Sequence, residues 1–221
     1  YQMLKENRSI AENSNAALEM ATGDFVCLLD HDDLLCKDAL AYMMQRLEEQ
    51  DYLFLYTDED KIDQTGTTVF EPNWKPDFNL DYLLSNNYIC HFSAIRADLM
   101  KKLQFRSNYD GAQDYDFVLR LTENTKKIYH CPRILYHWRC SNQSTAASQG
   151  NKMYAIHAGK AALNAHYKRI GWNARAQEGA VDGWYQTKFT LKEEPLVSIL
   201  IPNKDHTDAV SYTHLTLPTI A

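Results

Sequence analysis

Three acidic residues follow a short apolar stretch near the start of the chain. Residues 25–29 have the length and composition of a buried strand, and Asp30, Asp32 and Asp33 come directly after them. A strand that ends in carboxylates places them at the carboxyl edge of an α/β sheet, where such folds bind ligands. Carboxylate oxygens suit Mg²⁺ or Mn²⁺, which often share the phosphates of a substrate. The alternative is a solvated acidic turn that caps the next helix, and the sequence leaves both open.

A second acidic candidate is Asp114, which follows Gly111 at the predicted start of a helix. Read alone, Asp114 fits an N-cap, because aspartate accepts hydrogen bonds from the first helical N–H groups. The functional alternative is a general base, which needs a carboxylate within reach of a substrate proton. A third candidate is the pair His137 and Arg139. A neutral imidazole can bind Mn²⁺ and a guanidinium can bind a diphosphate, although a lone histidine is more often structural.

The pattern of apolar residues predicts an α/β fold, with a mixed, mostly parallel sheet flanked by helices. Helical periodicity covers residues 7–22, 38–49, 114–123 and 151–170. Strand-like composition covers residues 25–29, 52–56, 88–96, 128–131, 134–138 and 185–191. The second of these strands also ends in acids, Asp58, Glu59 and Asp60. A strand, a helix and a strand at this spacing predict a βαβ unit. Residues 71–87 are expected to form a loop or a lid.

The composition excludes several classes of protein. The chain has 221 residues, 45% of them hydrophobic and 24% charged, which is enough to bury a core. A net charge of −6 argues against non-specific binding to nucleic acid. No apolar run approaches the roughly 20 residues of a membrane span, and the first residues do not resemble a signal peptide. Five cysteines without a C-x-x-C pair indicate reduced thiols in a cytoplasmic protein.

Both ends of the sequence read as interrupted. A parallel sheet needs strands before the first predicted helix, so we expect a domain over residues 1–192 that is N-terminally truncated. Residues 194–203 have the composition of a strand after a polar break, and we interpret residues 193–210 as the start of a second, truncated domain. Residues 211–221 continue no pattern and are interpreted as a non-native tail.

These motifs, in this order, resemble the glycosyltransferases of family 2, which have the GT-A fold and invert the anomeric centre. The resemblance covers about residues 4–190 and rests on six segments: residues 6–15, 21–33, 56–61, 75–77, 111–117 and 136–139. The chain is similar to bacterial enzymes that make rhamnan, O-antigen and related surface polysaccharides, several of which carry tandem transferase domains. In two respects the chain departs from the family. Gln113 stands where the family usually has Glu, and the first strand with its base-binding loop is missing.

The resemblance implies a role for each candidate. Asp30 and Asp32 match the motif that binds a divalent metal, Mn or Mg, and the donor diphosphate. Asp114 matches the catalytic base that deprotonates the acceptor hydroxyl. His137 matches a third metal ligand or diphosphate contact, and Arg139 assists the leaving group. Contacts with the acceptor, or a lid over the site, are expected from four residues: Asp58, Asp60, Trp74 and Lys75.

The implied function is the transfer of a sugar from a nucleotide-sugar donor to a hydroxyl of a growing surface glycan. The acceptor is a glycan or a lipid-linked glycan, and no nucleic acid is involved. We expect a cytoplasmic enzyme at the inner face of the plasma membrane, associated peripherally through the parent protein. Two other classes remain open: a non-catalytic module that binds nucleotide sugars or glycans, and a nucleotidyltransferase.

Overall fold

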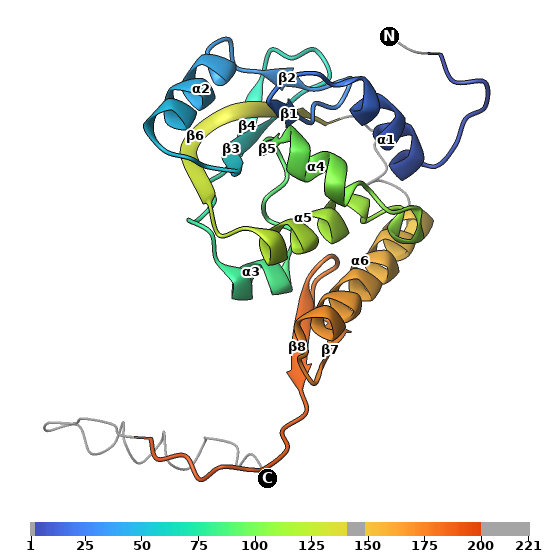
Figure 1. The fold of residues 1–221 in the computed structure, drawn as a ribbon, viewed down its shortest axis with the longest axis vertical. Coiled ribbons are helices and arrows are strands. Elements are labelled where there is room, and N and C mark those ends of the chain that lie inside the picture. Colours follow the sequence, from blue (N-terminus) through green and yellow to red (C-terminus); the bar gives the residue numbers. More distant parts are fainter. Residues whose placement is uncertain (1–2, 141–148, 200–221) are drawn as a thin grey trace, which may run out of the picture. The chain divides into compact units, whose positions relative to one another are not determined.

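The computed structural model describes residues 3–140 and 149–199. The chain divides into two compact units, residues 1–190 and 191–221. The first unit contains a six-stranded sheet with helices, then a long helix in contact with a two-stranded hairpin (Figure 1). Its helices are α1 (Ile10–Met20), α2 (Ala39–Glu49), α3 (Leu80–Ser85), α4 (Ala97–Leu103), the 3-10 turn η1 (Ser107–Tyr109), α5 (Gln113–Asn124) and α6 (Gln149–Ile170). Its strands are β1 (Phe25–Cys27), β2 (Leu34–Leu35), β3 (Phe54–Ile62), β4 (Val69–Asn73), β5 (Ser93–Arg96), β6 (Ile128–Arg139), β7 (Ala174–Glu178) and β8 (Tyr185–Phe189).

The six-stranded sheet is mixed. Its strand order is β1-β5-β3-β6-β2, with β4 paired to β3 outside this path. β3 and β6 are parallel along their whole shared length, and the other pairings in the described chain are antiparallel. β1, β3 and β6 therefore run in one direction. The α/β class with a mixed sheet flanked by helices is confirmed. The predicted βαβ unit keeps its strand directions, but β5 lies between β1 and β3, so parallel neighbours are fewer than the sequence indicated.

The central strands are longer than predicted. β3 continues through Asp58, Glu59 and Asp60, whereas the sequence placed these acids after the strand. Buried carboxylates are tolerated within a strand when they are paired, and these three bind histidine or lysine groups. The two short strands expected around Pro132 form the single strand β6. Its register with β3 shifts near Asp58, and such a bulge accommodates a proline inside a sheet.

The expectation of a loop or lid over residues 71–87 was wrong in part, because this range contains the end of β4 and the helix α3. β3 and β4 form a hairpin whose turn is built by Asp63, which accepts hydrogen bonds from the N–H groups of Thr67 (2.8 Å) and Thr68 (3.1 Å). Asn79 is the N-cap of α3, and its side chain accepts a hydrogen bond from the N–H of Tyr82 at 2.9 Å. These local bonds give regular structure to a segment whose prolines favoured a loop.

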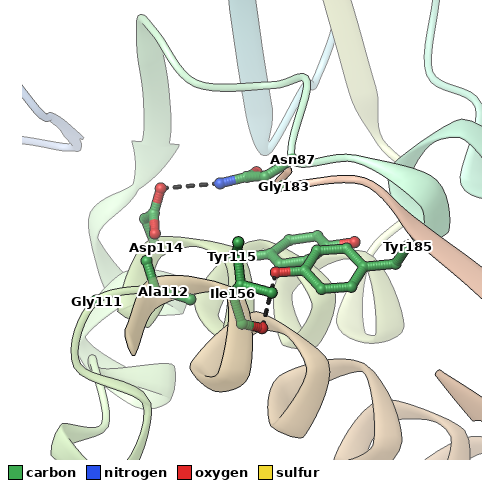
Figure 2. A pocket seen from close by; sticks show the side chains of 9 residues that line it. Asn87, Gly111, Ala112, Asp114, Tyr115, Ile156, Gly183 and Tyr185 are labelled. Atoms are coloured by element: carbon green, nitrogen blue, oxygen red, sulfur yellow. Dashed lines mark hydrogen bonds between the residues drawn. The ribbon is translucent and has the colours of Figure 1, made fainter. Parts of the chain in front are cut away.

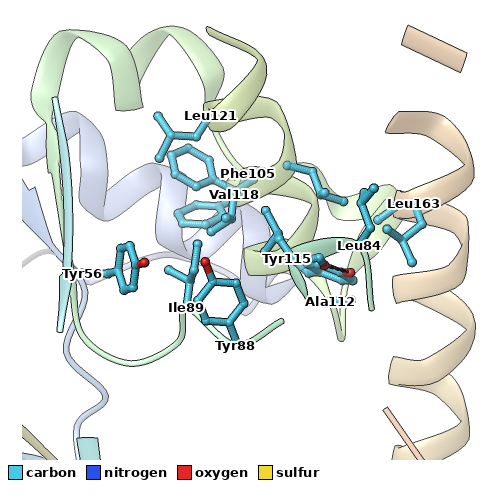
Figure 3. Close-up of a cluster of buried hydrophobic side chains, with 14 of the residues drawn as sticks. Tyr56, Leu84, Tyr88, Ile89, Phe105, Ala112, Tyr115, Val118, Leu121 and Leu163 are labelled. Atoms are coloured by element: carbon cyan, nitrogen blue, oxygen red, sulfur yellow. Dashed lines mark hydrogen bonds between the residues drawn. The ribbon is translucent and has the colours of Figure 1, made fainter. Parts of the chain in front are cut away.

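Side chains of alternate residues in β3 face opposite sides of the sheet, which separates the core into two layers. Phe54 and Tyr56 pack with residues of α1, α3, α4, α5 and α6. Leu55, on the other side, packs with Ala39 and Met43 of α2. Figure 3 shows the larger cluster, in which α5 is the element between the strands and α6. The beginning of α5 is therefore held firmly over one face of the sheet.

A buried charge network also fixes α5. Asp116 is fully buried and accepts from Nε of Arg106 (3.0 Å) and from Nε of Arg120 (2.9 Å). The guanidinium of Arg120 in turn donates to the carbonyls of Leu103 and Gln104, each at 2.6 Å. These bonds join α5 to the end of α4, and removing one partner would leave a buried charge uncompensated.

The second unit is described only for residues 191–199, and these contain no helix or strand. The strand predicted to begin at residue 194 is therefore absent up to residue 199. The apolar side chains of this segment are exposed, Leu196 at 99% and Ile199 at 68%. A strand needs a partner strand for its backbone hydrogen bonds. The rest of the predicted second domain and the predicted tail 211–221 lie outside the described residues. Across the two described ranges, no helix has the length and apolarity needed to cross a membrane.

Candidate active site

The acidic turn after β1 is held in place by β6. Asp33 is buried, and its carboxylate accepts hydrogen bonds from the hydroxyl of Tyr136 and from the N–H of Arg139 (2.7 Å). The N–H of Asp30 donates to the same Tyr136 hydroxyl at 3.4 Å. Asp33 therefore has a structural role, while Asp30 and Asp32 remain exposed beside it.

The charges around this turn are mainly negative. Partial desolvation raises the pKa of the Asp30 carboxyl; His91 opposes this shift, while Asp33, Asp32 and Asp114 add to it. The acidic turn and Asp114 therefore lie close enough for their charges to interact. Within the described ranges, no three potential ligands form a metal cluster. A set of two carboxylates fits a divalent cation that also binds substrate phosphates, and such a cation would relieve the repulsion.

Asp114 is the second residue of α5, and the N-cap position belongs to Ala112, so the N-cap interpretation does not describe Asp114. Its Oδ2 atom accepts from Nδ2 of Asn87 (2.9 Å) and from Sγ of Cys90 (3.1 Å). Its Oδ1 atom has no hydrogen-bond partner among the residues that the structure describes. The positive end of the helix dipole favours the carboxylate at this position.

A cavity of about 190 Å³ lies beside Asp114. α5, α6 and the tip of the β7–β8 hairpin contribute to its wall (Figure 2), which is formed by Asn87, Gly111, Ala112, Asp114, Tyr115, Ala155, Ile156, Gly183 and Tyr185. The Tyr185 hydroxyl donates to the carbonyl of Ile156 at 3.1 Å, which ties the hairpin to α6. Asp114 is the single acid in this wall. The arrangement presents one oriented carboxylate to a small, mostly apolar space.

Two residues that hold Asp114 were missed by the sequence interpretation. Burial and the nearby Asp114 raise the pKa of the Cys90 thiol well above its ordinary range, so the thiol remains a protonated donor. Asn87 also has a buried Oδ1 atom without a partner in the described structure. No motif marks either residue, because they act through contacts between segments 24 to 27 positions apart in sequence.

His137 lies in β6 opposite Leu34, the residue that follows Asp33, and its imidazole is bound within the protein. Its Nδ1 atom lies 2.5 Å from Oδ1 of Asp60, and its Nε2 atom lies 3.2 Å from Sγ of Cys36. Tyr136 and Trp138, its neighbours in β6, face His91 instead. Since side chains alternate along a strand, His137 points to the opposite face of the sheet from Tyr136 and Trp138. Both imidazole nitrogens are already engaged there.

Arg139 lies next to the turn, but its guanidinium binds backbone groups. Nε donates to the carbonyl of Asp32 (2.5 Å), and Nη1 donates to the carbonyls of Asp63 (3.2 Å) and Gln64 (2.8 Å). These bonds join the acidic turn to the β3–β4 turn. Arg139 therefore positions the backbone of Asp32 in this structure.

The four residues expected at the acceptor or in a lid differ in exposure. Asp58, Asp60 and Lys75 are 1%, 4% and 6% exposed, whereas Trp74 is 66% exposed. Asp58 accepts from the backbone N–H of Lys75 (2.9 Å) and lies 2.8 Å from Nε2 of His130. The three buried side chains are bound within the protein, which leaves Trp74 as the one of the four with a largely exposed surface.

Similarity to known proteins identifies the family of this chain. Residues 1–104 match the model of the family described as Glycosyl transferase family 2. The uncharacterized protein y4gI of Sinorhizobium fredii is 40% identical over 212 residues, which cover 94% of this chain and 23% of that protein. The O-antigen biosynthesis protein RfbC of Myxococcus xanthus is 34% identical over 200 residues, covering 90% and 16%. The chain thus spans about a quarter or less of these relatives.

A likeness to solved structures concerns the fold. The crystal structure of S. aureus TarS 1-349 superposes with a TM-score of 0.50 at 18% identity, covering 75% of this chain and 53% of that one. The same protein in complex with UDP-GlcNAc also gives 0.50, at 17% identity, covering 75% and 55%. The fold and the relatives together define a glycosyltransferase domain of the GT-A class. Residues 1–104 of the chain belong to glycosyl transferase family 2.

Proposed function

We propose that the protein transfers a sugar from a nucleotide-sugar donor to a hydroxyl of a growing surface glycan, with inversion at the anomeric carbon. The observation that carries the proposal is the orientation of Asp114. One of its carboxylate oxygens is bound by Asn87 and Cys90, and the residue lines a cavity large enough for part of a sugar. A carboxylate held in this way suits a general base.

In this proposal the acceptor hydroxyl enters the cavity and gives its proton to Oδ1 of Asp114. In a single displacement the acceptor oxygen bonds to the anomeric carbon while the bond from that carbon to the diphosphate oxygen breaks; the nucleoside diphosphate leaves with the electron pair, and no covalent enzyme intermediate forms. Asp30 and Asp32 hold a divalent cation, Mn or Mg, together with the diphosphate. The cation supplies electrostatic stabilisation of the leaving group when it is bound. Arg139 contributes by fixing the backbone of Asp32.

The glycan acceptor is proposed from the relatives. RfbC is named for O-antigen biosynthesis, and a 32% identical relative from Pasteurella multocida is named chondroitin synthase. Both names refer to the synthesis of polysaccharides. The expected cytoplasmic location, at the inner face of the membrane, belongs to this proposal because a lipid-linked acceptor would be presented there. Trp74 is the exposed candidate for an acceptor contact.

A donor screen tests the proposal. The protein in its natural full length is incubated with UDP-, GDP- and dTDP-sugars and Mn²⁺, and release of the nucleoside diphosphate is measured. We expect turnover of one donor, and a decrease of roughly a hundred- to ten-thousand-fold for Asp114→Asn. The amide keeps the size of the side chain, so the thermal midpoint should barely change. Donor binding without any turnover would instead support the non-catalytic binding module.

A further inference from the structure

His91 lies against the residue that holds the acidic turn. It follows Cys90 in the segment between α3 and β5. Its ring stacks on Tyr136, with ring centres 5.1 Å apart and planes 12° from parallel. The centre of its ring also lies 5.6 Å from that of Trp138. The hydroxyl of the same Tyr136 binds the backbone of Asp30. The imidazole is therefore next to the proposed diphosphate site, although no sequence motif indicated it.

A buried ion pair fixes the orientation of this imidazole. Oε2 of Glu59 lies 3.1 Å from Nδ1 of His91 and also accepts its backbone N–H. The ammonium of Lys75 donates to the carbonyl of His91 and lies 3.5 Å from the same Glu59 oxygen. The side chains of Glu59 and Lys75 are only 9% and 1% exposed. A carboxylate on Nδ1 fixes the ring, so that Nε2 is the nitrogen left to bind a ligand.

Nε2 of His91 has no hydrogen-bond partner in the described ranges. The side chain of His91 is 31% exposed, so part of the ring is accessible to a ligand. Burial alone would lower the pKa of His91, but the hydrogen bond and charge of Glu59 and the charge of Asp30 outweigh it and raise the pKa. The ring therefore carries positive charge more readily than a free histidine.

His91 also lies between the two halves of the proposed site. The preceding residue, Cys90, donates a hydrogen bond to the base Asp114. His91 itself interacts electrostatically with Asp30. A donor held at the acidic turn and attacked near Asp114 must place its phosphates within this region. A cationic donor at this point complements a diphosphate, because charge-assisted hydrogen bonds to phosphate are strong.

We propose that His91 binds the diphosphate of the nucleotide-sugar donor, donating a hydrogen bond from Nε2 to a phosphate oxygen. The ligand class is a nucleoside diphosphate and its sugar ester. This inference rests on the proposed function and assigns a role that was expected of His137. Glu59 and Lys75 act as positioning residues, since they hold His91 and do not reach the ligand.

Calorimetry with UDP, GDP and dTDP, each with and without Mn²⁺, tests the assignment on the protein in its natural full length. His91→Phe keeps the ring on Tyr136 but removes both nitrogens, and His91→Gln keeps an amide donor without the charge. His157→Gln, which changes an exposed histidine on α6, is the matched control. Losing one hydrogen bond to a charged group predicts an affinity decrease of about 10- to 100-fold for His91→Phe. His91→Gln should lose less, and His157→Gln should bind like the wild type.

Each outcome separates this inference from the proposed function. If the wild type binds a nucleoside diphosphate and His91→Phe binds it equally well, the role of His91 is refuted while the proposed function stands. A loss that occurs only with Mn²⁺ would make His91 a metal ligand and also refute the phosphate contact. If the wild type binds none of the three nucleotides, the proposed function fails and this inference fails with it. Should His91→Phe not fold, a shift of the wild-type His91 Nε2 signal in ¹⁵N NMR on adding the bound nucleotide decides the same question. An unchanged signal refutes the contact.

Discussion

Asn87→Ala removes the amide that holds the proposed base, and the structure allows the size of its effect to be worked out. The bond from Nδ2 of Asn87 to Asp114 is 2.9 Å long and its acceptor is charged. Its loss therefore removes about 1.5–3 kcal/mol of stabilisation from the oriented carboxylate. Cys90 still donates to the same oxygen, which favours the lower end of this range. We therefore expect kcat to fall about tenfold, since about 1.4 kcal/mol corresponds to one factor of ten.

Stability should change little in Asn87→Ala. The Oδ1 atom of Asn87 is buried without a partner in the described structure, so its removal offsets part of the lost bond. The assay measures release of the nucleoside diphosphate at saturating donor, and thermal unfolding is followed in parallel. Asn124→Ala is the matched control, because the Asn124 amide donates to the carbonyl of Arg120 at the far end of α5 and not to Asp114. A tenfold slower enzyme in the control, or an unchanged kcat in Asn87→Ala, would refute the reasoning.

Three further predictions concern the metal, the core and pH. Asp32→Asn should abolish the Mn²⁺-dependent part of nucleoside diphosphate binding in calorimetry, and unchanged affinity would favour a plain acidic turn. Arg120→Met should lower the free energy of unfolding by about 3–5 kcal/mol, measured in urea, because Asp116 would keep a buried charge with one partner fewer. Because the pKa of His91 is raised in the folded protein, its protonation adds to the free energy of unfolding. This contribution should be fully present below about pH 6.5, the ordinary histidine value, and be lost as pH rises through the folded pKa. His91→Gln, which leaves Glu59 in place, should remove this decline; a decline of the same size in the variant would show that another group causes it.

The sequence predicted the elements with strong local patterns. α2 begins within one residue of its predicted start, and α5 and α6 were also placed correctly, because their apolar residues recur at helical spacing. The sequence did not predict the elements whose extent depends on contacts between distant segments. β3 extends through three acids only because its partners neutralise them, and α4, which follows β5 directly, was not predicted as a separate element.

The candidate site shows the same division. Asp30, Asp32 and Asp114 were named from motifs, and the structure brings their charges into range of one another. His137 was also named from a motif, and its role stays a prediction; in this structure its imidazole contacts Asp60 and Cys36. His91, Asn87 and Cys90 belong to no motif, since each acts through a partner that is distant in sequence. A pattern of residue types along the chain does not reveal contacts between segments that are distant in sequence.

Asn86 and Asn87 are consecutive residues whose side chains reach two different parts of the protein. One amide binds the tip of the β7–β8 hairpin at Gly183, and the next binds the carboxylate of Asp114. The hairpin and the base are thus connected through a single peptide unit. An acceptor that displaces the hairpin tip would also turn the carboxylate that must deprotonate it. Acceptor fit and base alignment are in this way mechanically linked, so a poorly fitting acceptor is expected to lower kcat as well as raise KM.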